Sequence, residues 1–457
     1  MRLSIDKKIL LISYHFAPSS AVGGLRIEGF AKHLPSYGWD PCVLTMPEKN
    51  SQGLDYERLR NLKGLRILRT GKLPGALETY LKLKAVYSSL LQRKKISVAD
   101  LERAYEMARP NSIEPSKSAA HRLKTFLFSF LTLPDSERNW ILPAFLAAFQ
   151  EIRRSGIRVV LTSSPPHSVQ LIGLLLKKLC GVAWIADFRD PWLRPLGKSN
   201  SPISRLSLIF ENMLEKMVLC SADRVIITNE MLAEALRRSY LSCDPYKFIS
   251  IPNGYDPELD AFSKGVQKYE TFTITHAGTL YLGRTPEPLF SAVRELIYEK
   301  KVERKDIRIK LLGNSDILNG KTMGQVVSDY DLTDIVELSG RVSYPQALKT
   351  ISKSHLALLL APEQPYQIPA KTYDYIGCRT PILAIANCGA TSHLVQSTET
   401  GKVCRPEAIE EIKTFLYDSF QSRSMAPGYE KTFASRYSRK KLAGALAEVL
   451  DKAGAEV

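Results

Sequence analysis

The sequence lacks the signatures of several common protein classes. None of its apolar runs approaches the roughly 18 residues that a helix needs to span a bilayer. The first run, Ile9–Ile12, is also too short for a signal peptide, because Tyr14 and His15 follow almost at once. The seven cysteines include no Cys-x-x-Cys pair, which argues against structural zinc. Their odd number and apolar surroundings favour free thiols in a reducing cytoplasm.

The composition is that of an ordinary globular protein. Apolar residues make up 44% and charged residues 24% of the 457 positions. These values exclude disordered, collagen-like and disulfide-scaffold proteins, and the length indicates two or more domains. The net charge of +16 is uneven: positions 1–200 hold 31 basic and 16 acidic residues, whereas positions 201–457 hold 32 and 31. The N-terminal half is therefore expected to face an anionic partner.

Two blocks of alternating strands and helices predict an α/β fold with two Rossmann-like domains, whose parallel sheets face a cleft. A basic, mostly helical insertion is expected at about 70–135 of the first domain. The predicted boundaries give an N-terminal domain at 1–255, a C-terminal domain at 256–425 and terminal helices at 426–457. Strands are expected at 8–13, 157–162, 183–188, 224–229, 247–251, 271–277, 307–312, 335–338, 356–361 and 381–386, and helices near 168–180, 204–219, 230–239, 287–300, 345–353, 371–377, 407–420 and 438–450.

Two positions in the first block follow strand ends and suit a ligand. Gly23 and Gly24 come after the first strand and before a helix, where glycine lets backbone N–H groups approach a phosphate. The Gly-x-Gly-x-x-Gly pattern is absent, and a tight turn explains the pair equally well. His167 opens another helix after a strand end, where an imidazole can exchange a proton near neutral pH. A histidine that caps or packs the helix is the alternative.

A charged cluster follows the strand expected at 183–188. Asp187 and Asp190 flank Arg189 there. The carboxylates either bind sugar hydroxyls or pair with the arginine as a structural ion cluster. A metal site would need a third oxygen ligand, which the sequence does not identify.

The second block carries two clusters that suit an anionic ligand. Gly278 and Thr279 follow a strand, and Arg284 precedes the next helix, an arrangement that suits a diphosphate unless the arginine is simply solvated. Lys371 stands near the start of a further helix, where a cation opposes the helix dipole and therefore indicates an anionic partner. Asp374 follows one turn later on roughly the same face.

Motifs that run along nearly the whole chain carry a resemblance to a known family. They are Pro18…Gly23-Gly24-Leu25-Arg26, Pro134-Asp135…Trp140, Ser164-Pro165-Pro166-His167, Asp187-Phe188-Arg189-Asp190-Pro191-Trp192, Ala222-Asp223-Arg224-Val225, Ile251-Pro252-Asn253-Gly254-Tyr255-Asp256, Gly340-Arg341-Val342 and Pro369-Ala370-Lys371-Thr372-Tyr373-Asp374-Tyr375. In their order and spacing they resemble the retaining GT-B glycosyltransferases of glycosyltransferase family 4, also called group 1. The basic segment 50–140 is the least covered part.

The resemblance implies how the two domains divide the work. The C-terminal domain would hold most of the donor, a UDP- or GDP-linked sugar, while the N-terminal domain would hold most of the acceptor. The last helix would cross back to the N-terminal domain. Such enzymes retain the anomeric configuration without a cofactor or a metal, because cations and helix N-termini stabilise the leaving diphosphate.

The resemblance also assigns roles by position. Asp374 matches the second carboxylate of a Glu-x7-Glu motif that holds the ribose hydroxyls. Tyr366 replaces the first glutamate, and Glu363 is close but out of register. The expected catalytic residues are His167, Arg284 and Lys371, the donor-binding residues are Gly23, Gly24, Gly278, Thr279 and Asp374, and the acceptor-side residues are Arg26, Asp187, Arg189 and Asp190.

Three hypotheses of function follow. The first is a hexosyltransferase of polysaccharide biosynthesis that acts on a lipid-diphosphate-linked saccharide at the cytoplasmic face of the inner membrane. The basic N-terminal half and the apolar stretch at 121–131 favour an anionic membrane, although a solvated basic face is the alternative. The second is a nucleotide-sugar 2-epimerase on the same fold. The third, a polyanion-binding protein, lacks any helix-turn-helix, RNP or zinc-finger motif, so nucleic acid is not an expected partner.

Overall fold

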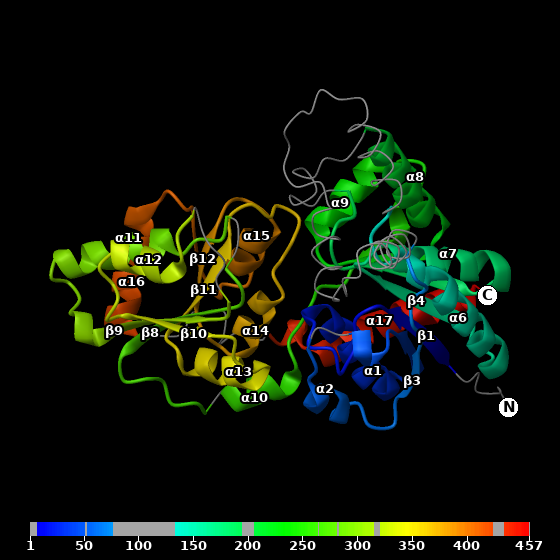
Figure 1. The fold of residues 1–457 in the computed structure, drawn as a ribbon, viewed down its shortest axis with the longest axis horizontal. Coiled ribbons are helices and arrows are strands. Elements are labelled where there is room, and N and C mark those ends of the chain that lie inside the picture. The colour runs from blue at the N-terminus through cyan, green and yellow to red at the C-terminus, as the bar shows by residue number, and fades with distance from the viewer. Residues whose placement is uncertain are drawn as a thin grey trace, which may run out of the picture. The chain divides into compact units, whose positions relative to one another are not determined.

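The computed structural model describes residues 7–50, 53–75, 133–193, 205–263, 265–280, 283–314, 320–423 and 434–456 (Figure 1). Most of the insertion expected at about 70–135, including the apolar stretch at 121–131, lies outside these residues. The contacts divide the chain into two compact units. Unit 1 comprises Met1–Ile227, Ala235–Ile249 and Leu446–Val457, and unit 2 comprises Thr228–Glu234 and Ser250–Ala445. The domain boundaries expected after residues 255 and 425 stay predictions.

Unit 1 is built on a seven-stranded sheet in the order β3-β2-β1-β4-β5-β6-β7. Parallel pairing places Ile9 of β1 opposite both Pro41 and Val159, so the first strand lies in the middle of the sheet. The expected apolar run of the first strand is buried, as in parallel sheets that are covered on both faces. The strands are β1 Lys8–Ser13, β2 Asp40–Thr45, β3 Arg66–Arg69, β4 Val159–Ser164, β5 Ala183–Phe188, β6 Arg224–Ile227 and β7 Phe248–Ser250.

Helices of unit 1 start and stop at recognisable residues. The helices α6 and α7 end at Gly156 and Gly181, which adopt φ angles of 64° and 67°, the left-handed conformation that glycine accepts most readily. Asp135 accepts a hydrogen bond from the backbone N–H of Ser168 at the start of α7. The helices are α1 Leu25–His33, α2 Tyr56–Arg60, α6 Ile141–Ser155, α7 Ser168–Cys180, α8 Arg205–Ser221 and α9 Glu230–Ser239, the last shared with unit 2.

Two cysteines of unit 1 differ from the sequence expectation of free thiols. Cys220, near the end of α8, and Cys243, before β7, form a disulfide. The other five cysteines are free. The sequence does not predict this disulfide, because the two cysteines are 23 positions apart and form no recognisable spacing motif.

Unit 2 is built on a six-stranded sheet in the order β10-β9-β8-β11-β12-β13, and its strand pairings are parallel. The order reverses between β8 and β11, because the chain winds outward first in one direction and then in the other. Two parallel sheets with helices confirm the expected α/β fold. The strands are β8 Phe272–Ala277, β9 Ile307–Leu312, β10 Val336–Gly340, β11 Leu356–Ala361, β12 Ile382–Ala386 and β13 Gly401–Cys404.

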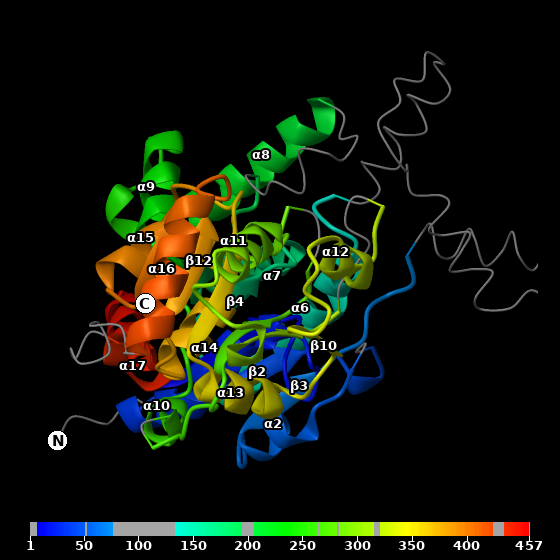
Figure 2. The ribbon, with the colours of Figure 1, turned by 90° about the vertical axis from the view of Figure 1, so that its left-hand side faces the viewer.

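Helices cover both faces of this second sheet. In β11, Leu356, Leu358 and Leu360 join one core while Ala357 and Leu359 join the other, the alternation that a strand buried on both faces requires. On the first face α11 and α16 pack side by side (Figure 2). The helices are α10 Pro257–Ser263, α11 Glu287–Tyr298, α12 Met323–Asp329, α13 Tyr344–Lys353, α14 Lys371–Gly377, α15 Ala390–Ser397, α16 Ile409–Ser422 and α17 Arg439–Ala455.

The last helix contributes to both units. Its first residues, up to Ala445, belong to unit 2, and the remainder belongs to unit 1. Asp451 accepts hydrogen bonds from Lys7 and from the indole of Trp39. None of the helices among the described residues is long and apolar enough to cross a membrane.

Candidate functional site

The main candidate site lies in unit 2 at the carboxyl ends of β8 and β11. In open parallel sheets, ligands bind outside the strand ends where the strand order reverses, because the connecting chains diverge there. Gly278 follows β8 at this point, and the loop after β11 leads to Lys371, the first residue of α14. The fold therefore brings together residues that lie almost a hundred positions apart.

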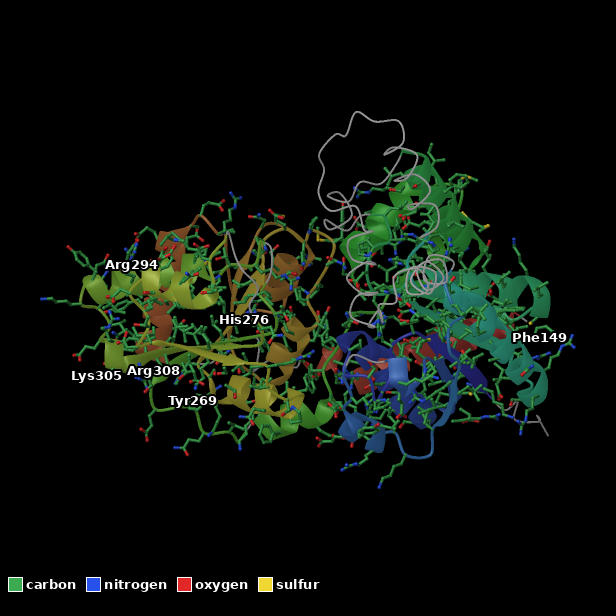
Figure 3. All side chains as sticks on the ribbon, viewed as in Figure 1. Phe149, Tyr269, His276, Arg294, Lys305 and Arg308 are labelled. Carbon is green, nitrogen blue, oxygen red and sulfur yellow. A yellow bond between two sulfur atoms is a disulfide. The ribbon has the colours of Figure 1, made fainter. Side chains whose placement is uncertain are left out.

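Lys371 and His276 form the central contact of this site. The Nζ atom of Lys371 lies 3.2 Å from Nε2 of His276, and Nδ1 of the same ring lies 2.9 Å from the carbonyl oxygen of Leu358. A carbonyl only accepts, so Nδ1 carries the ring proton and Nε2 of the neutral ring accepts from the lysine. His276, which Figure 3 labels, is completely buried.

The electrostatic environment of this contact disfavours positive charge. Burial, followed by repulsion from Arg284, lowers the pKa of Lys371 to about 7, while Asp374 opposes the shift. Burial and then the charge of Lys371 hold the pKa of His276 well below its usual value, so this ring stays neutral. A partly buried lysine whose pKa is near 7 and which is repelled by a second cation favours the binding of an anion.

Asp374 lies one turn along α14 from the lysine. One of its oxygens accepts a hydrogen bond of 2.7 Å from the hydroxyl of Tyr344. Burial raises the pKa of Asp374 to about 6, against the opposing effects of Arg439, Tyr344 and Lys371. The carboxylate thus lies near positive charges, with one oxygen held by the tyrosine.

Two glycines keep the backbone close to the lysine. Gly278 has a φ of +123°, and a Cβ atom there would lie 2.5 Å from Nζ of Lys371. Gly313, after β9, has a φ of +131°, and a Cβ atom there would lie 2.6 Å from the carbonyl oxygen of Gly278. Any larger residue would fill this space, which explains why glycine is needed at both positions. Thr279 is exposed beside them.

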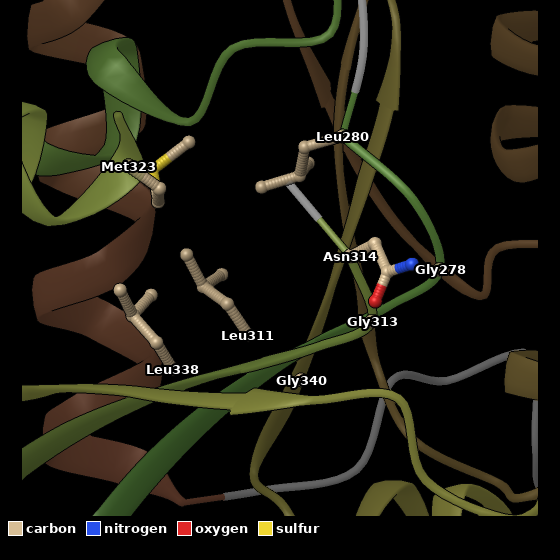
Figure 4. Close-up of a pocket in the computed structure, with 8 residues that line it drawn as sticks. All are labelled: Gly278, Leu280, Leu311, Gly313, Asn314, Met323, Leu338 and Gly340. Atoms are coloured by element: carbon tan, nitrogen blue, oxygen red, sulfur yellow. The ribbon is translucent and has the colours of Figure 1, made fainter. Parts of the chain in front are cut away.

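A cavity of about 470 Å³ adjoins these glycines (Figure 4). Apolar side chains point into it from one side, and the glycine backbones border the other, an arrangement typical of small-molecule sites. Among the described residues, Asn314 supplies the one amide side chain of the lining. The lining residues are Gly278, Leu280, Leu311, Gly313, Asn314, Met323, Leu338 and Gly340.

The loop after β11 places the residues expected for the first motif carboxylate. Glu363 is exposed, and its Oε2 atom lies 3.7 Å from the position that a Cβ of Gly283 would occupy. The backbone carbonyl of Tyr366 accepts a hydrogen bond of 2.8 Å from the side chain of Asn229. A carboxylate is therefore available on this loop, although three residues earlier than the family pattern requires.

The glycine turn of unit 1 is tied to the neighbouring strand end by Arg189. Its guanidinium donates to the backbone carbonyls of Gly23, Ser164 and Pro165. This side chain is buried, and burial lowers its pKa. Arg189 thus organises the turn through carbonyl oxygens.

Asp187 forms an ion pair with Arg26, whereas the structural alternative expected from the sequence was an ion cluster with Arg189. The guanidinium of Arg26 lies 2.9 Å from Oδ1 of Asp187, and both side chains are almost fully buried. Ser163 donates to the other carboxylate oxygen at 2.6 Å. The sequence could not indicate this partner, because 161 residues separate the pair.

His167 packs at the start of α7. Its ring stacks on that of Trp192, with centroids 4.9 Å apart and planes inclined by 11°. The ring is 7% exposed, and Asp190 lies nearby in sequence with partial exposure. His167 therefore packs against Trp192, as the alternative of a packing histidine describes.

The structure groups the expected residues in two sets. Gly278, Arg284, Lys371 and Asp374 lie at one strand-end crevice of unit 2, while Gly23, His167 and Arg189 lie at the strand ends of unit 1. Sequence reasoning missed His276 and Tyr344, because their roles come from partners 95 and 30 positions away. Within the described parts of the chain, no group of three His, Cys, Asp or Glu residues is arranged to hold a metal ion.

Comparison with known proteins gives two kinds of match. The family model described as "Glycosyl transferase 4-like domain" matches residues 23–254. Sucrose-phosphate synthase from Thermosynechococcus elongatus aligns with 15% identity and a TM-score of 0.64, covering 99% of this chain and 100% of that one.

Two structures of HepE from Anabaena also align. The complex with UDP has 13% identity and a TM-score of 0.60, covering 97% of this chain and 100% of that one. The complex with UDP-glucose has 13% identity and a TM-score of 0.57, covering 97% and 99%. A search of curated proteins finds no match.

Proposed function

The chain belongs to the glycosyl transferase 4-like family and is a glycosyltransferase of the GT-B type, and on this premise we propose that it transfers a hexose, with retention of configuration, from a nucleoside-diphosphate sugar to a lipid-linked saccharide. The observation that carries the proposal is the pair of cations, Lys371 and Arg284, beside the glycine turn at Gly278. A diphosphate is the ligand that this arrangement would stabilise best.

The cations explain how the reaction would proceed. The bond between the anomeric carbon and the diphosphate oxygen breaks, and the acceptor oxygen bonds to the same face of the sugar. The acceptor proton leaves with the departing diphosphate. Negative charge grows on that diphosphate in the transition state, and a preorganised lysine and arginine stabilise growing charge without reorganisation. We therefore propose a reaction without a metal ion or a cofactor.

The donor nucleotide is proposed from the cavity and the structural neighbours. The apolar and glycine-lined cavity beside Gly278 would hold the base, and Asp374 would accept from ribose hydroxyls. The HepE structures contain UDP and UDP-glucose, which supports a UDP-linked sugar ahead of a GDP-linked one.

The acceptor is proposed from charge. The first 200 residues carry 31 basic and 16 acidic side chains. Each Lys or Arg near an anionic surface contributes about 1 kcal/mol of attraction. This excess supports an acceptor carried on a lipid diphosphate, a role in polysaccharide or exopolysaccharide biosynthesis, and peripheral binding at the cytoplasmic face of the inner membrane.

A panel of ligands in thermal unfolding tests the donor proposal. UDP or GDP is expected to raise the unfolding temperature, because a ligand that binds only the folded state at about 100 times its Kd adds roughly 2.7 kcal/mol. Uridine and guanosine, which lack the diphosphate, serve as matched controls and are expected to give little shift. If no nucleoside diphosphate stabilises the protein, the proposed donor site is wrong.

Incubation with the donor sugar alone distinguishes transfer from the epimerase alternative. A transferase is expected to release nucleoside diphosphate slowly as water replaces the acceptor. Accumulation of an epimerised nucleotide sugar would instead support a 2-epimerase.

A further inference from the structure

His276 contacts Lys371 but has no role in the transfer reaction proposed above. The residue stands on β8, one of the two strands that flank the reversal of strand order, and its Nδ1–H donates to Leu358 on the other. This bond fixes the orientation of the ring across the crevice. The opposite nitrogen, Nε2, then faces Nζ of Lys371 at 3.2 Å.

Lys371 needs such a support. A lysine side chain has several rotatable bonds, and holding it in one place costs conformational entropy. The ammonium also stands at the start of α14, where the helix dipole repels it. Among the described residues, its hydrogen-bond partner is His276 alone, and no carboxylate lies within ion-pair distance.

We propose that His276 is a positioning residue that holds the ammonium of Lys371 in place for the donor diphosphate. This inference rests on the proposed function. It adds a role for the side-chain contact between His276 of β8 and Lys371 of α14. The histidine touches neither sugar nor phosphate in this assignment and acts only through the lysine.

The neutrality of His276 is what makes it suitable. A carboxylate in its place would also hold the lysine, but it would cancel the charge and compete with the diphosphate for the same hydrogens. An imidazole whose proton is committed to a carbonyl supplies only a lone pair. The histidine therefore does not cancel the charge of the protonated lysine.

The charged groups that face the lysine agree with this arrangement. Arg284, from the loop after β8, repels it, and Asp374, one turn along α14, attracts it at longer range. Gly278 leaves room for the ammonium, because a Cβ atom there would lie 2.5 Å from Nζ. Backbone, histidine and helix thus define one location for the charge.

Substitutions of His276 separate positioning from simple packing. His276→Leu removes the acceptor, while the Leu358 carbonyl still receives the hydroxyl of Tyr375 at 3.2 Å. UDP and GDP binding, measured by calorimetry at pH 6.5, is expected to weaken about tenfold, the loss of one hydrogen bond to a charged group. His276→Gln, which returns an acceptor toward the lysine, is expected to restore binding to within about threefold of wild type.

The pH dependence of nucleotide binding gives a readout that packing alone would not move. Wild-type affinity is expected to fall as Lys371 loses its proton at rising pH. Without the histidine acceptor the ammonium is less stable, so the midpoint of this fall should move to lower pH in His276→Leu and return in His276→Gln. His355→Leu is the matched control, since His355 is a buried histidine of the same unit that accepts from the backbone of Thr273.

The outcomes distinguish the inference from the function on which it rests. If wild-type protein binds neither UDP nor GDP, the proposed function fails and the inference with it. If wild type binds and His276→Leu matches His355→Leu in affinity and midpoint, only the inference fails. Should His276→Leu not fold, His276→Phe, a planar ring without a lone pair for the lysine, replaces it in the comparison with His276→Gln.

Discussion

Replacement of Lys371 by methionine is expected to weaken the binding of UDP or GDP about a hundredfold, the cost of removing one partner from a buried, hydrogen-bonded charge pair. The side chain has similar length but no charge, and Arg284 alone cannot hold the diphosphate in the same way. Calorimetric titration of wild type and Lys371→Met at pH 6.5, where the wild-type lysine is protonated, measures the difference.

The same substitution is expected to change stability with a sign that depends on pH. Burial and Arg284 lower the pKa of Lys371 from its usual value near 10.5 to about 7, a shift that corresponds to roughly 5 kcal/mol if fully expressed. Between these values the unfolded chain binds more protons than the folded one, so wild-type stability rises with pH in this window. The buried charge of Lys371 therefore lowers the free energy of unfolding most below pH 7.

Methionine removes that cost but leaves Nε2 of His276 without its donor, which costs about 1–3 kcal/mol. Lys371→Met should therefore be more stable than wild type at pH 6 and less stable at pH 10. Urea unfolding at both pH values measures the crossover.

Lys268→Met is the matched control for the affinity measurement. Lys268 is also a partly buried lysine of unit 2, with a pKa lowered to about 8, mainly by burial. It donates to the carbonyls of Ser352 and Ser354, away from the crevice. Its substitution should leave nucleotide affinity unchanged. Equal affinities of wild type and Lys371→Met would contradict the assigned role of Lys371.

Substitution of Gly313 by alanine is expected to destabilise unit 2 by about 3 kcal/mol, because strain and overpacking add at this position. The φ of +131° lies outside the region that alanine tolerates, and the new Cβ would lie 2.6 Å from a backbone oxygen of Gly278. Neither backbone can yield easily, since Gly278 donates to Leu312 and Gly313 donates to Gly340. Movement of Gly278 would also disturb the contact with Lys371.

Gly340→Ala provides the comparison for this strain. Gly340 has a φ of +61°, and nothing lies within 4 Å of the position of its Cβ. Alanine there should cost only about 1 kcal/mol, the ordinary penalty of the left-handed conformation. Urea unfolding of both variants measures the contrast in stability. Equal losses of stability would show that the close approach of Gly313 to Gly278 is not tight.

Much of the fold follows from the sequence where apolar runs are long. The strands Ala183–Phe188 and Leu356–Ala361 have the expected bounds, because mainly apolar runs specify buried parallel strands. The strand Ile307–Leu312 also has the expected bounds, and there apolar residues alternate with Arg308 and Lys310. The edge strand Gly401–Cys404 escaped prediction since its four residues include a glycine and a lysine. The helix Met323–Asp329, with seven residues, also escaped prediction.

The candidate site was predictable only in part. The unfavourable position of Lys371 at a helix start indicates an anionic partner, and its lowered pKa agrees with that reasoning. The histidine that holds it could not be found in the same way, because the pairing of β8 with β11 brings it there. The buried pair of Arg26 and Asp187 depends likewise on the neighbouring strands of unit 1.

A crystal structure of the protein with UDP or GDP tests the central claim most directly. The account predicts that the diphosphate lies against the backbone of Gly278 within hydrogen-bond distance of Nζ of Lys371, with the base in the cavity lined by Leu311 and Gly340. Lys371 should keep its contact with His276 in that complex. A nucleotide bound elsewhere, or a diphosphate that leaves Lys371 without contact, would contradict the account.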